Sequence, residues 1–397
     1  IFVYPSWTRR YEMRDTVRPH FSFTNNTQYT TFREPLAKIL EGIPHGESKG
    51  NRPYQMNMEQ FLDILIYYHL THPDSGRHLI QELEQDSFAK TMIAPHEGVK
   101  KSSFFEAMHS RDFGFLIKVF NALSAQAFSA LPQEYSNLGE LVAIDGTFID
   151  VVLSATWADY RTDSKKAKAH FGFSVNHSIP SHFTLTDGKA DERKEVKHLI
   201  SKGQTAITDR YYQCHANFDQ WQAEGIHFVC RIRENTTKTI IMENPLTPGS
   251  KIFYDAIVSL GSSKVNSTHT PLRVVGYRVG VKTYWIATDR RDLTAEQIAE
   301  IYLLRWKIEV FFGWWKRHLN VYHLIARSYH GLMIQILAGL ITYLLLTLYC
   351  HNSFREKVSI RRVRELRIAI NNHYLFPCLF FMQLFIKSRS PAYHAIS

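Results

Sequence analysis

The chain has few cysteines and no pattern that would tie them together. Its four cysteines are Cys214, Cys230, Cys350 and Cys378, with no CxxC pair and no histidines at zinc-site spacing. Scattered thiols of this kind argue against a disulfide framework or a structural zinc site, and they are typical of a reducing compartment. We therefore expect a cytoplasmic location. Residues 1–23 are basic and aromatic rather than charged and then apolar, so we expect no signal peptide.

Charged residues are missing from one long segment. Between Ser328 and Phe354 there is no Asp, Glu, Lys or Arg, and the stretch from Gly331 to Cys350 is almost wholly apolar. That length is sufficient to cross a bilayer, but a helix buried in a large core has the same composition. Because no other segment resembles a membrane span, we expect a core helix packed behind a sheet, and no membrane partner.

An excess of acidic residues is also lacking. The chain has 47 Lys and Arg against 37 Asp and Glu, a net charge of +10, and a pI near 9.3. This balance fits a polyanionic partner such as nucleic acid, although charge that serves only solubility would look the same. A hydrophobic content of 45% in 397 residues excludes a disordered chain and allows two or three domains.

The order of helical and β-type patterns predicts an α+β protein. Helical spacing over residues 56–70 and 110–128, with no convincing strand pattern, predicts a helical N-terminal domain preceded by a basic arm. Beyond residue 139, β-type runs alternate with short helices, which indicates a mixed sheet. A helix resumes after Asp292, with Thr294 as N-cap and Gln297 three positions on. The expected divisions are 1–135 (helical), 136–235 (core, first part), 236–293 (β-rich insertion), 294–350 (core, second part) and 351–397 (basic tail).

One helical segment carries an unusual polar stripe. Tyr302, Arg305, Glu309 and Lys316 follow one another at steps of three, four and seven residues. These steps place all four side chains on one face of a helix. A carboxylate flanked by two permanent cations suits a helix that presents an acid to a metal ion while the cations hold an anion beside it.

Two aspartates follow apolar β-type runs. Asp145 comes after residues 141–144, and Asp209 comes after residues 205–208. Carboxylates at strand ends can converge in a crevice of the sheet. Taken singly, Asp145 fits a common Asp-Gly turn and Asp209 a surface ion pair. Together with Glu309 they would form three mutually repelling acids, which favours hard divalent cations: two Mg²⁺ or Mn²⁺ ions rather than zinc.

These residues resemble the bacterial insertion-sequence transposases of the DDE class, in the family typed by insertion sequence 4. Three blocks match: IDGT around Asp145, TDRYY around Asp209, and Y-x2-R-x3-E-x6-K from Tyr302 to Lys316. The intervals of 64 (209 − 145) and 100 (309 − 209) also fit, since the second holds the β-rich segment. The resemblance covers about residues 139–350.

The resemblance implies an RNase H-like mixed-sheet catalytic core interrupted by a β-rich insertion. It implies metal-dependent strand cleavage and strand transfer at the inverted-repeat ends of an insertion sequence. Asp145, Asp209 and Glu309 would be the catalytic metal ligands, holding two Mg²⁺ or Mn²⁺ ions. The expected partners are double-stranded DNA (terminal inverted repeats and target) and a second copy in a synaptic homodimer, in the bacterial cytoplasm near the nucleoid.

The resemblance also implies contacts with DNA. Tyr302, Arg305 and Lys316 would hold the terminal phosphates. Trp306 would stack a flipped base, although a core tryptophan is an equally good interpretation. Further contacts are expected from a basic run, which could also be a solvated loop, and from the residue after the second aspartate: Lys165, Lys166, Lys168, His170 and Arg210.

Two other functions remain open from the sequence. A nuclease on the same core, such as a resolvase or RNase H, would not need the cations beside Glu309 or the long insertion. A catalytically inactive or domesticated DNA-binding protein would not need to keep all three acids and the complete stripe. Both alternatives are therefore weaker than a transposase.

Overall fold

The computed structural model describes residues 27–44, 48–49, 52–151, 155–161, 164–262, 266–321 and 323–371. Its helices are α1 (Thr27–Leu40), α2 (Met58–Thr71), α3 (Gly76–Gln85), α4 (Lys101–Ser110), α5 (Phe113–Ala130), α6 (His215–Glu224), α7 (Ala295–Leu304), α8 (Trp306–His318), α9 (Tyr329–Phe354) and α10 (Ile360–Asn371). Its strands are β1 (Ser48–Lys49), β2 (Arg52–Pro53), β3 (Leu141–Asp150), β4 (Asp159–Arg161), β5 (Ser164–Ser174), β6 (Ile179–Asp187), β7 (Thr205–Thr208), β8 (His227–Arg231), β9 (Lys238–Glu243), β10 (Ile252–Leu260), β11 (Leu272–Val279) and β12 (Lys282–Thr288).

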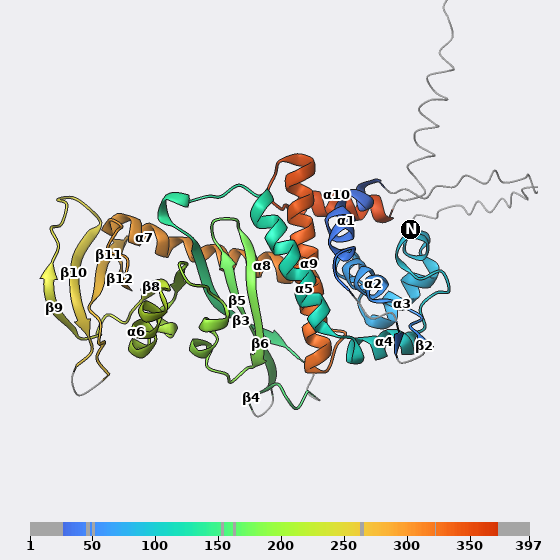
Figure 1. Cartoon of the computed structure of the whole chain (residues 1–397), viewed down its shortest axis with the longest axis horizontal. Helices are drawn as coiled ribbons and strands as arrows, with labels where there is room; N and C mark the ends of the chain where they lie inside the picture. Colours follow the sequence, from blue (N-terminus) through green and yellow to red (C-terminus); the bar gives the residue numbers. More distant parts are fainter. Residues whose placement is uncertain are drawn as a thin grey trace, which may run out of the picture.

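The molecule is elongated, with helices at one end, a sheet in the middle and β9–β12 at the other end (Figure 1). The predicted N-terminal helices are present as α2 and α5, and Asn57 and Gln60 form a capping box at the start of α2. The short β1–β2 pair was not predicted, because strands of two residues leave no periodic pattern. The basic arm expected near the N-terminus lies outside the described residues.

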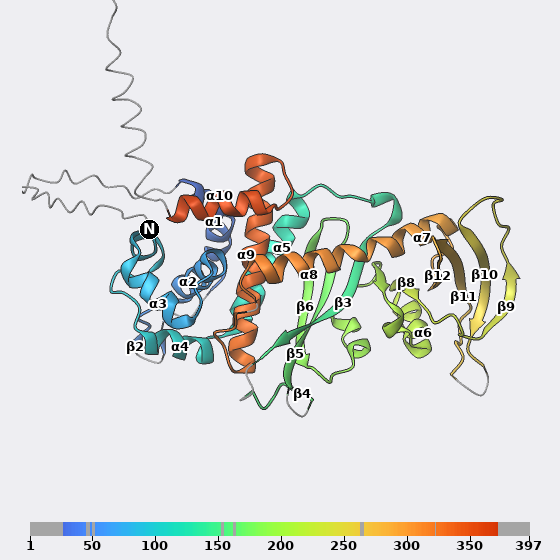
Figure 2. The ribbon, with the colours of Figure 1, turned by 180° about the vertical axis from the view of Figure 1, so that it is seen from behind.

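Helix α9 is the predicted core helix. Every residue from Gly331 to Cys350 is buried. Its neighbours differ from the expectation: α9 packs mainly against α5, α2, α1 and α4, and its contact with the sheet is a smaller one at β6 (Figures 1 and 2). The apolar surface is therefore enclosed by the N-terminal helices, which can bury a helix on all sides, whereas a sheet covers only one. Both α5 and α9 are long and apolar enough to cross a membrane by composition.

The central strands have the order β6-β5-β3-β7-β8. β6, β5 and β3 are joined antiparallel, whereas β7 and β8 run parallel to β3. This is the predicted RNase H-like mixed sheet. The two faces of β3 are covered differently: Leu141 and Ala143 pack in the cluster that includes α8 and α9, while Val142 and Ile144 pack in the cluster that includes α6. By strand alternation, the odd-numbered residues of β3, including Asp145, therefore lie on the face covered by α8 and α9, and the even-numbered residues lie on the face covered by α6.

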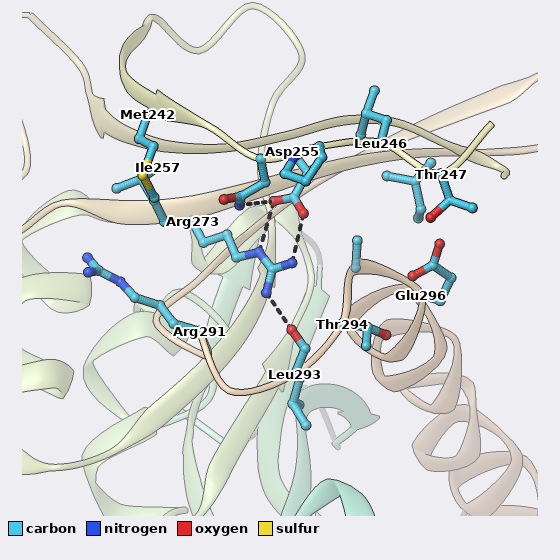
Figure 3. Close-up of a pocket in the computed structure, with 14 residues that line it drawn as sticks. Met242, Leu246, Thr247, Asp255, Ile257, Arg273, Arg291, Leu293, Thr294 and Glu296 are labelled. Carbon is cyan, nitrogen blue, oxygen red and sulfur yellow. Dashed lines mark hydrogen bonds and ion pairs between the residues drawn. The ribbon is translucent and has the colours of Figure 1, made fainter.

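The predicted β-rich insertion continues the same sheet. β12 pairs antiparallel with β8, and β11, β10 and β9 follow in order. A buried ion pair joins this part to the helix that follows: Arg273 donates to both carboxylate oxygens of Asp255 and to the carbonyl of Leu293 (Figure 3). Leu293 directly precedes the N-cap Thr294, so the insertion fixes where α7 begins. Beside this pair lies a cavity of about 500 Å³.

Candidate active site

Strand register places Asp145 and Asp209 at the same level. β3 and β7 are parallel, and Leu141 lies opposite Thr205, an offset of 64 residues (205 − 141). The same offset separates Asp145 from Asp209 (209 − 145). The interval noted in the sequence is thus the register of two neighbouring strands. By alternation, both carboxylates lie on the face covered by α8.

The sequence predicted that Asp145 lies at the end of a strand, but the structure places it inside β3. β3 continues to Asp150 because β5 remains its partner there, with Asp145 opposite Phe171. The Asp-Gly pair that suggested a turn is held extended by this partner. Asp209 does follow the end of β7, and its Oδ1 accepts a hydrogen bond from the backbone N–H of Tyr211 at 2.7 Å.

Helices α7 and α8 bring Glu309 to these aspartates. The predicted capping box between Thr294 and Gln297 is confirmed. The helix is divided at Arg305, but this residue keeps helical dihedral angles (φ −51°, ψ −33°). The two parts therefore continue one another across the face of the sheet (Figure 2). Glu309 lies one turn beyond Arg305, near the start of α8.

Arg305 joins two of the three acids. Its Nη1 lies 3.0 Å from Asp145 Oδ2 and 3.3 Å from Glu309 Oε1. The Arg305 side chain is only 16% exposed, so this contact is shielded from solvent. The structure therefore brings Asp145 and Glu309 to one cation, from elements far apart in the sequence.

The surroundings of Asp145 disfavour its negative charge. Burial raises the pKa of its carboxyl group to about 7. Arg305 opposes this effect, whereas the nearby charges of Glu309 and Asp209 add to it. A carboxylate beside two others gains from any cation that neutralises the group.

This pKa predicts a pH-dependent stability cost. Because the carboxyl of Asp145 binds its proton more tightly in the folded chain, stability should fall as pH rises from about 4 to about 7. Asp145→Asn should therefore be more stable than the parent at pH 8, by up to about 4 kcal/mol, with a smaller difference at pH 5. Thermal unfolding at both pH values measures this. An exposed control, Glu84→Gln, should show no such change, and equal differences at both pH values would contradict the prediction.

Lys316 lies at the far end of the stripe and is bound to β3. Its Nζ donates to Thr147 Oγ1 at 2.6 Å and to the carbonyl of Phe148 at 2.7 Å. Burial lowers the pKa of Lys316 to about 8. Arg305 and Lys316 thus both face β3, with Arg305 near Asp145 and Lys316 near Thr147. Its predicted contact with phosphate stays a prediction.

The two aromatic candidates are placed differently. Tyr302 is buried, and its ring centroid lies 6.0 Å from that of Tyr284. Its predicted phosphate contact stays a prediction. Trp306 is 65% exposed, so the interpretation of a core tryptophan is wrong. An exposed indole next to Arg305 leaves a surface on which a base can stack.

Two residues of the basic run are not available to DNA. The basic run is not a solvated loop but part of β5, whose alternation turns some of its side chains inward. Lys168 and His170 are buried, so their predicted contacts with DNA are wrong. Lys165 and Lys166 are half-buried, and Lys166 Nζ lies 3.0 Å from Asp150. Arg210 is exposed beside Asp209.

The sequence did not identify three residues that adjoin the acids. Thr147 belongs to the IDGT block but had been assigned no contact. Glu192 begins the first of two 3₁₀ turns, Glu192–Lys194 and Val196–His198. Tyr212 is buried behind Asp209. Tyr212 belongs to the TDRYY block but had been assigned no contact, and no local pattern distinguishes Glu192 from surface residues.

The acids suit a hard divalent cation by chemistry. All three offer carboxylate oxygens, the donors that Mg²⁺ and Mn²⁺ prefer. The raised pKa of Asp145 reflects partly buried like charges that a cation would relieve. In the described part of the chain, no three His, Cys, Asp or Glu side chains already stand at metal-binding separation. Arg305 lies between Asp145 and Glu309, so ion binding would require this guanidinium to move.

Comparison with known proteins gives consistent matches. A family model described as "Transposase DDE domain" matches residues 136–345, which include all three acids. The chain is 26% identical over 231 residues to "Probable transposase for insertion sequence element IS5377" from Geobacillus stearothermophilus, covering 57% of this chain and 61% of that protein. It is 24% identical over 273 residues to "Putative transposase for insertion sequence element IS4SA" from Synechocystis, covering 66% and 75%.

A third relative, "Putative transposase y4zB" from Sinorhizobium fredii, is 27% identical over 210 residues, covering 51% of this chain and 59% of that protein. The chain thus spans about three-fifths of the length of the IS5377 and y4zB relatives that it matches. Among solved structures, a piggyBac transposase synaptic complex with hairpin DNA aligns with a TM-score of 0.43 at 13% identity, covering 94% of this chain and 85% of that one.

Proposed function

The chain belongs to the transposase DDE-domain family, and we propose that it is a DNA transposase that cleaves and joins strands at the inverted-repeat ends of an insertion sequence. The observation that carries this proposal is the meeting of Asp145 and Glu309 at Arg305, with Asp209 in register on the adjacent strand. The proposed substrates are these DNA ends and a target duplex. The proposed assembly is a homodimer that holds two ends, in the cytoplasm of a bacterium.

We propose that Asp145, Asp209 and Glu309 hold two Mg²⁺ or Mn²⁺ ions. Ions in such a pair activate a water or a 3′-hydroxyl and stabilise the leaving oxygen of a phosphodiester. The protein supplies the carboxylates on a rigid strand pair and a helix, which limits their movement during the reaction. Arg305 would turn from the acids to a phosphate of the DNA end, since a guanidinium binds either anion in the same way.

Other residues near the acids have proposed roles on DNA. Lys316, at the far end of the stripe, would contact a second phosphate. Trp306 would stack a base displaced from the end of the duplex. Arg210, which is exposed beside Asp209, would contact the backbone on the opposite side. Together these residues surround the acids with cations and one free aromatic face.

The test of this function is cleavage of the element's own ends. Incubation of the full chain with a duplex carrying the terminal inverted repeat and its flank should give cuts at the element boundary. Cleavage should need Mg²⁺ or Mn²⁺ and should stop in EDTA. A duplex with a scrambled repeat is the control. Cutting of both duplexes at equal rates would favour a non-specific nuclease, and specific binding without cutting would favour an inactive DNA-binding protein.

The corrected basic run gives a second prediction. Lys165→Gln with Lys166→Gln should weaken DNA binding and reduce the slope of log K against log salt by about 1.8, if each lysine neutralises one phosphate. Binding isotherms between 50 and about 200 mM salt measure this slope. The control pair is Lys197→Gln with Lys202→Gln, two exposed lysines that precede β7 at its opposite end from Asp209. An unchanged slope in the first pair would exclude phosphate contacts there.

A further inference from the structure

The far side of β3, behind Asp145, holds a second polar cluster. It consists of Glu192, Lys168 and Tyr212, and it lies on the face of the sheet covered by α6 rather than α8. We propose that Glu192 is a positioning residue for Asp145: its carboxylate, fixed by Lys168 and Tyr212, supports the backbone of β3 at Gly146. This inference rests on the proposed function, because it assigns the cluster to the same reaction.

Two bonds hold the Glu192 carboxylate in place. Lys168 Nζ lies 2.7 Å from Glu192 Oε1, and the Tyr212 hydroxyl donates to Glu192 Oε2 at 2.8 Å. The side chains of Lys168 and Glu192 are only 7% and 15% exposed. Lys168 Nζ also lies 4.9 Å from the ring centroid of Phe148, on the same face of β3. A shielded carboxylate with a partner on each oxygen has little freedom to turn away.

Gly146 shows how closely this carboxylate approaches β3. A Cβ atom added to Gly146 would lie 2.9 Å from Glu192 Oε2 and 3.1 Å from its carboxyl carbon. The end of a flexible side chain would usually yield to such a methyl group, but Glu192 is held at both oxygens. Only glycine therefore lets the strand rest against the carboxylate at this level. The glycine of the IDGT block has a packing reason that the sequence did not reveal.

Gly146, the residue that Glu192 supports, directly follows Asp145 and is hydrogen-bonded to its side chain. The backbone N–H of Gly146 donates to Asp145 Oδ1 at 2.8 Å, so the catalytic carboxylate is oriented by the residue that Glu192 supports. Arg305 holds the other oxygen from the opposite face. Displacement of Gly146 would thus move Asp145 relative to Asp209 and Glu309. Errors of about 1 Å in such positions lower reaction rates by about 100-fold.

The inference also accounts for a residue that the sequence misassigned. Lys168 is buried in the structure, where an unpaired ammonium group would be costly. Its partner Glu192 lies 24 positions away (192 − 168) and is joined to it only by the fold. The pair thus supplies a charged, rigid support inside the protein rather than a contact with DNA.

The experiment compares three variants of the full chain. Glu192→Gln keeps the size of the side chain and its hydrogen bond from Tyr212, but leaves the Lys168 ammonium without a counter-charge. Glu192→Gln with Lys168→Met restores charge balance with side chains of similar volume. Glu195→Gln is the matched control, because Glu195 lies in the adjacent turn and accepts from Thr184 instead. Each is assayed for kcat at saturating end DNA, for DNA affinity in Ca²⁺, and for Mn²⁺ affinity by electron paramagnetic resonance.

We expect Glu192→Gln to lower kcat by about 10- to 100-fold while DNA affinity stays within about twofold. The double variant should recover to within about threefold of the parent, and Glu195→Gln should match the parent. A parental kcat in Glu192→Gln would overturn the inference, as would lost DNA affinity with kcat retained. A double variant no better than the single one would also overturn it. Should Glu192→Gln fail to fold, Tyr212→Phe removes one donor to Glu192 and should lower kcat in the same way.

Failure of the proposed function would look different. In that case the parent protein itself would not cut end DNA. The positioning role of Glu192 would still be tested by comparing the Mn²⁺ affinities of the parent and Glu192→Gln. Weaker Mn²⁺ binding in Glu192→Gln than in the parent, by about fivefold or more, supports the positioning role. Equal affinity in the two proteins would contradict it. A parent that neither cuts DNA nor binds Mn²⁺ would remove both proposals together.

Discussion

Asp145→Asn, Asp209→Asn and Glu309→Gln are each expected to lower the rate of end cleavage at least about 1,000-fold. Each change keeps the size of the side chain and removes one negative charge from the proposed metal site. The three acids act as one unit, so the loss from any two together should be little greater than from one. Single-turnover cleavage of an end duplex in Mg²⁺ measures the effect, and DNA binding in Ca²⁺ shows that the variants still fold and bind.

A carboxylate on the same helix serves as the control. Glu300 is exposed on α7, five residues (305 − 300) before Arg305. Glu300→Gln should therefore cleave like the parent. If all three acid variants cleaved at the parental rate, the proposed mechanism would be wrong. Loss of activity in only one or two of them would show that the remaining acid is not required for cleavage.

Arg305→Gln is expected to destabilise the metal-free protein by about 1–3 kcal/mol. This arginine is the shared partner of Asp145 and Glu309, and its removal leaves two carboxylates facing each other without a cation. The value is below that of a fully buried pair because the Glu309 side chain is 38% exposed and partly screened. Chemical denaturation in EDTA measures the change.

Mn²⁺ should reverse this loss. Because the variant lacks the resident cation, we expect Mn²⁺ to bind it more tightly than the parent and to raise its stability more at equal concentration. Arg361→Gln provides the control, since Arg361 forms a comparable pair with Glu365 at 2.9 Å but is 75% exposed. That variant should be about as stable as the parent, with no dependence on Mn²⁺, because an ion pair this exposed contributes little. If Arg305→Gln were as stable as the parent and bound Mn²⁺ no better, the ion pairs would have no role in the site.

The parts of the site that could be predicted depend on short-range patterns. Steps of three, four and seven residues fix one helix face whatever surrounds the helix, so the stripe containing Arg305 and Glu309 was predictable. The capping box at Thr294 is equally local. The apolar run of α9 predicts burial but not its neighbours, because any sufficiently large apolar surface can cover a helix.

The misassigned residues depend on strands that pair at long range. Asp145 looked like a turn residue, and only β5, more than twenty positions later, keeps its strand extended. The basic run looked exposed because Lys168 and His170 lie among lysines. Their burial depends on the pairing of β5 with β3 and β6, and on Glu192 beyond both strands. When a strand carries charges on both faces, its sequence does not show which face other parts of the protein will cover.

By itself, the sequence was sufficient to predict three acids as one set, since their order, their spacing and the helix stripe are properties of the chain as written. The order of its β-type runs also predicted a mixed sheet, and the resemblance to DDE transposases implied that this sheet is RNase H-like. The tertiary structure alone decided where the acids lie: the register of β3 and β7 places Asp145 and Asp209 at the same level of the sheet, and the insertion sets where α7 begins. It also decided that Arg305 lies between acids and that Lys168 faces inward. Such outcomes follow from contacts between distant segments, and a residue's own neighbours in sequence carry no information about them.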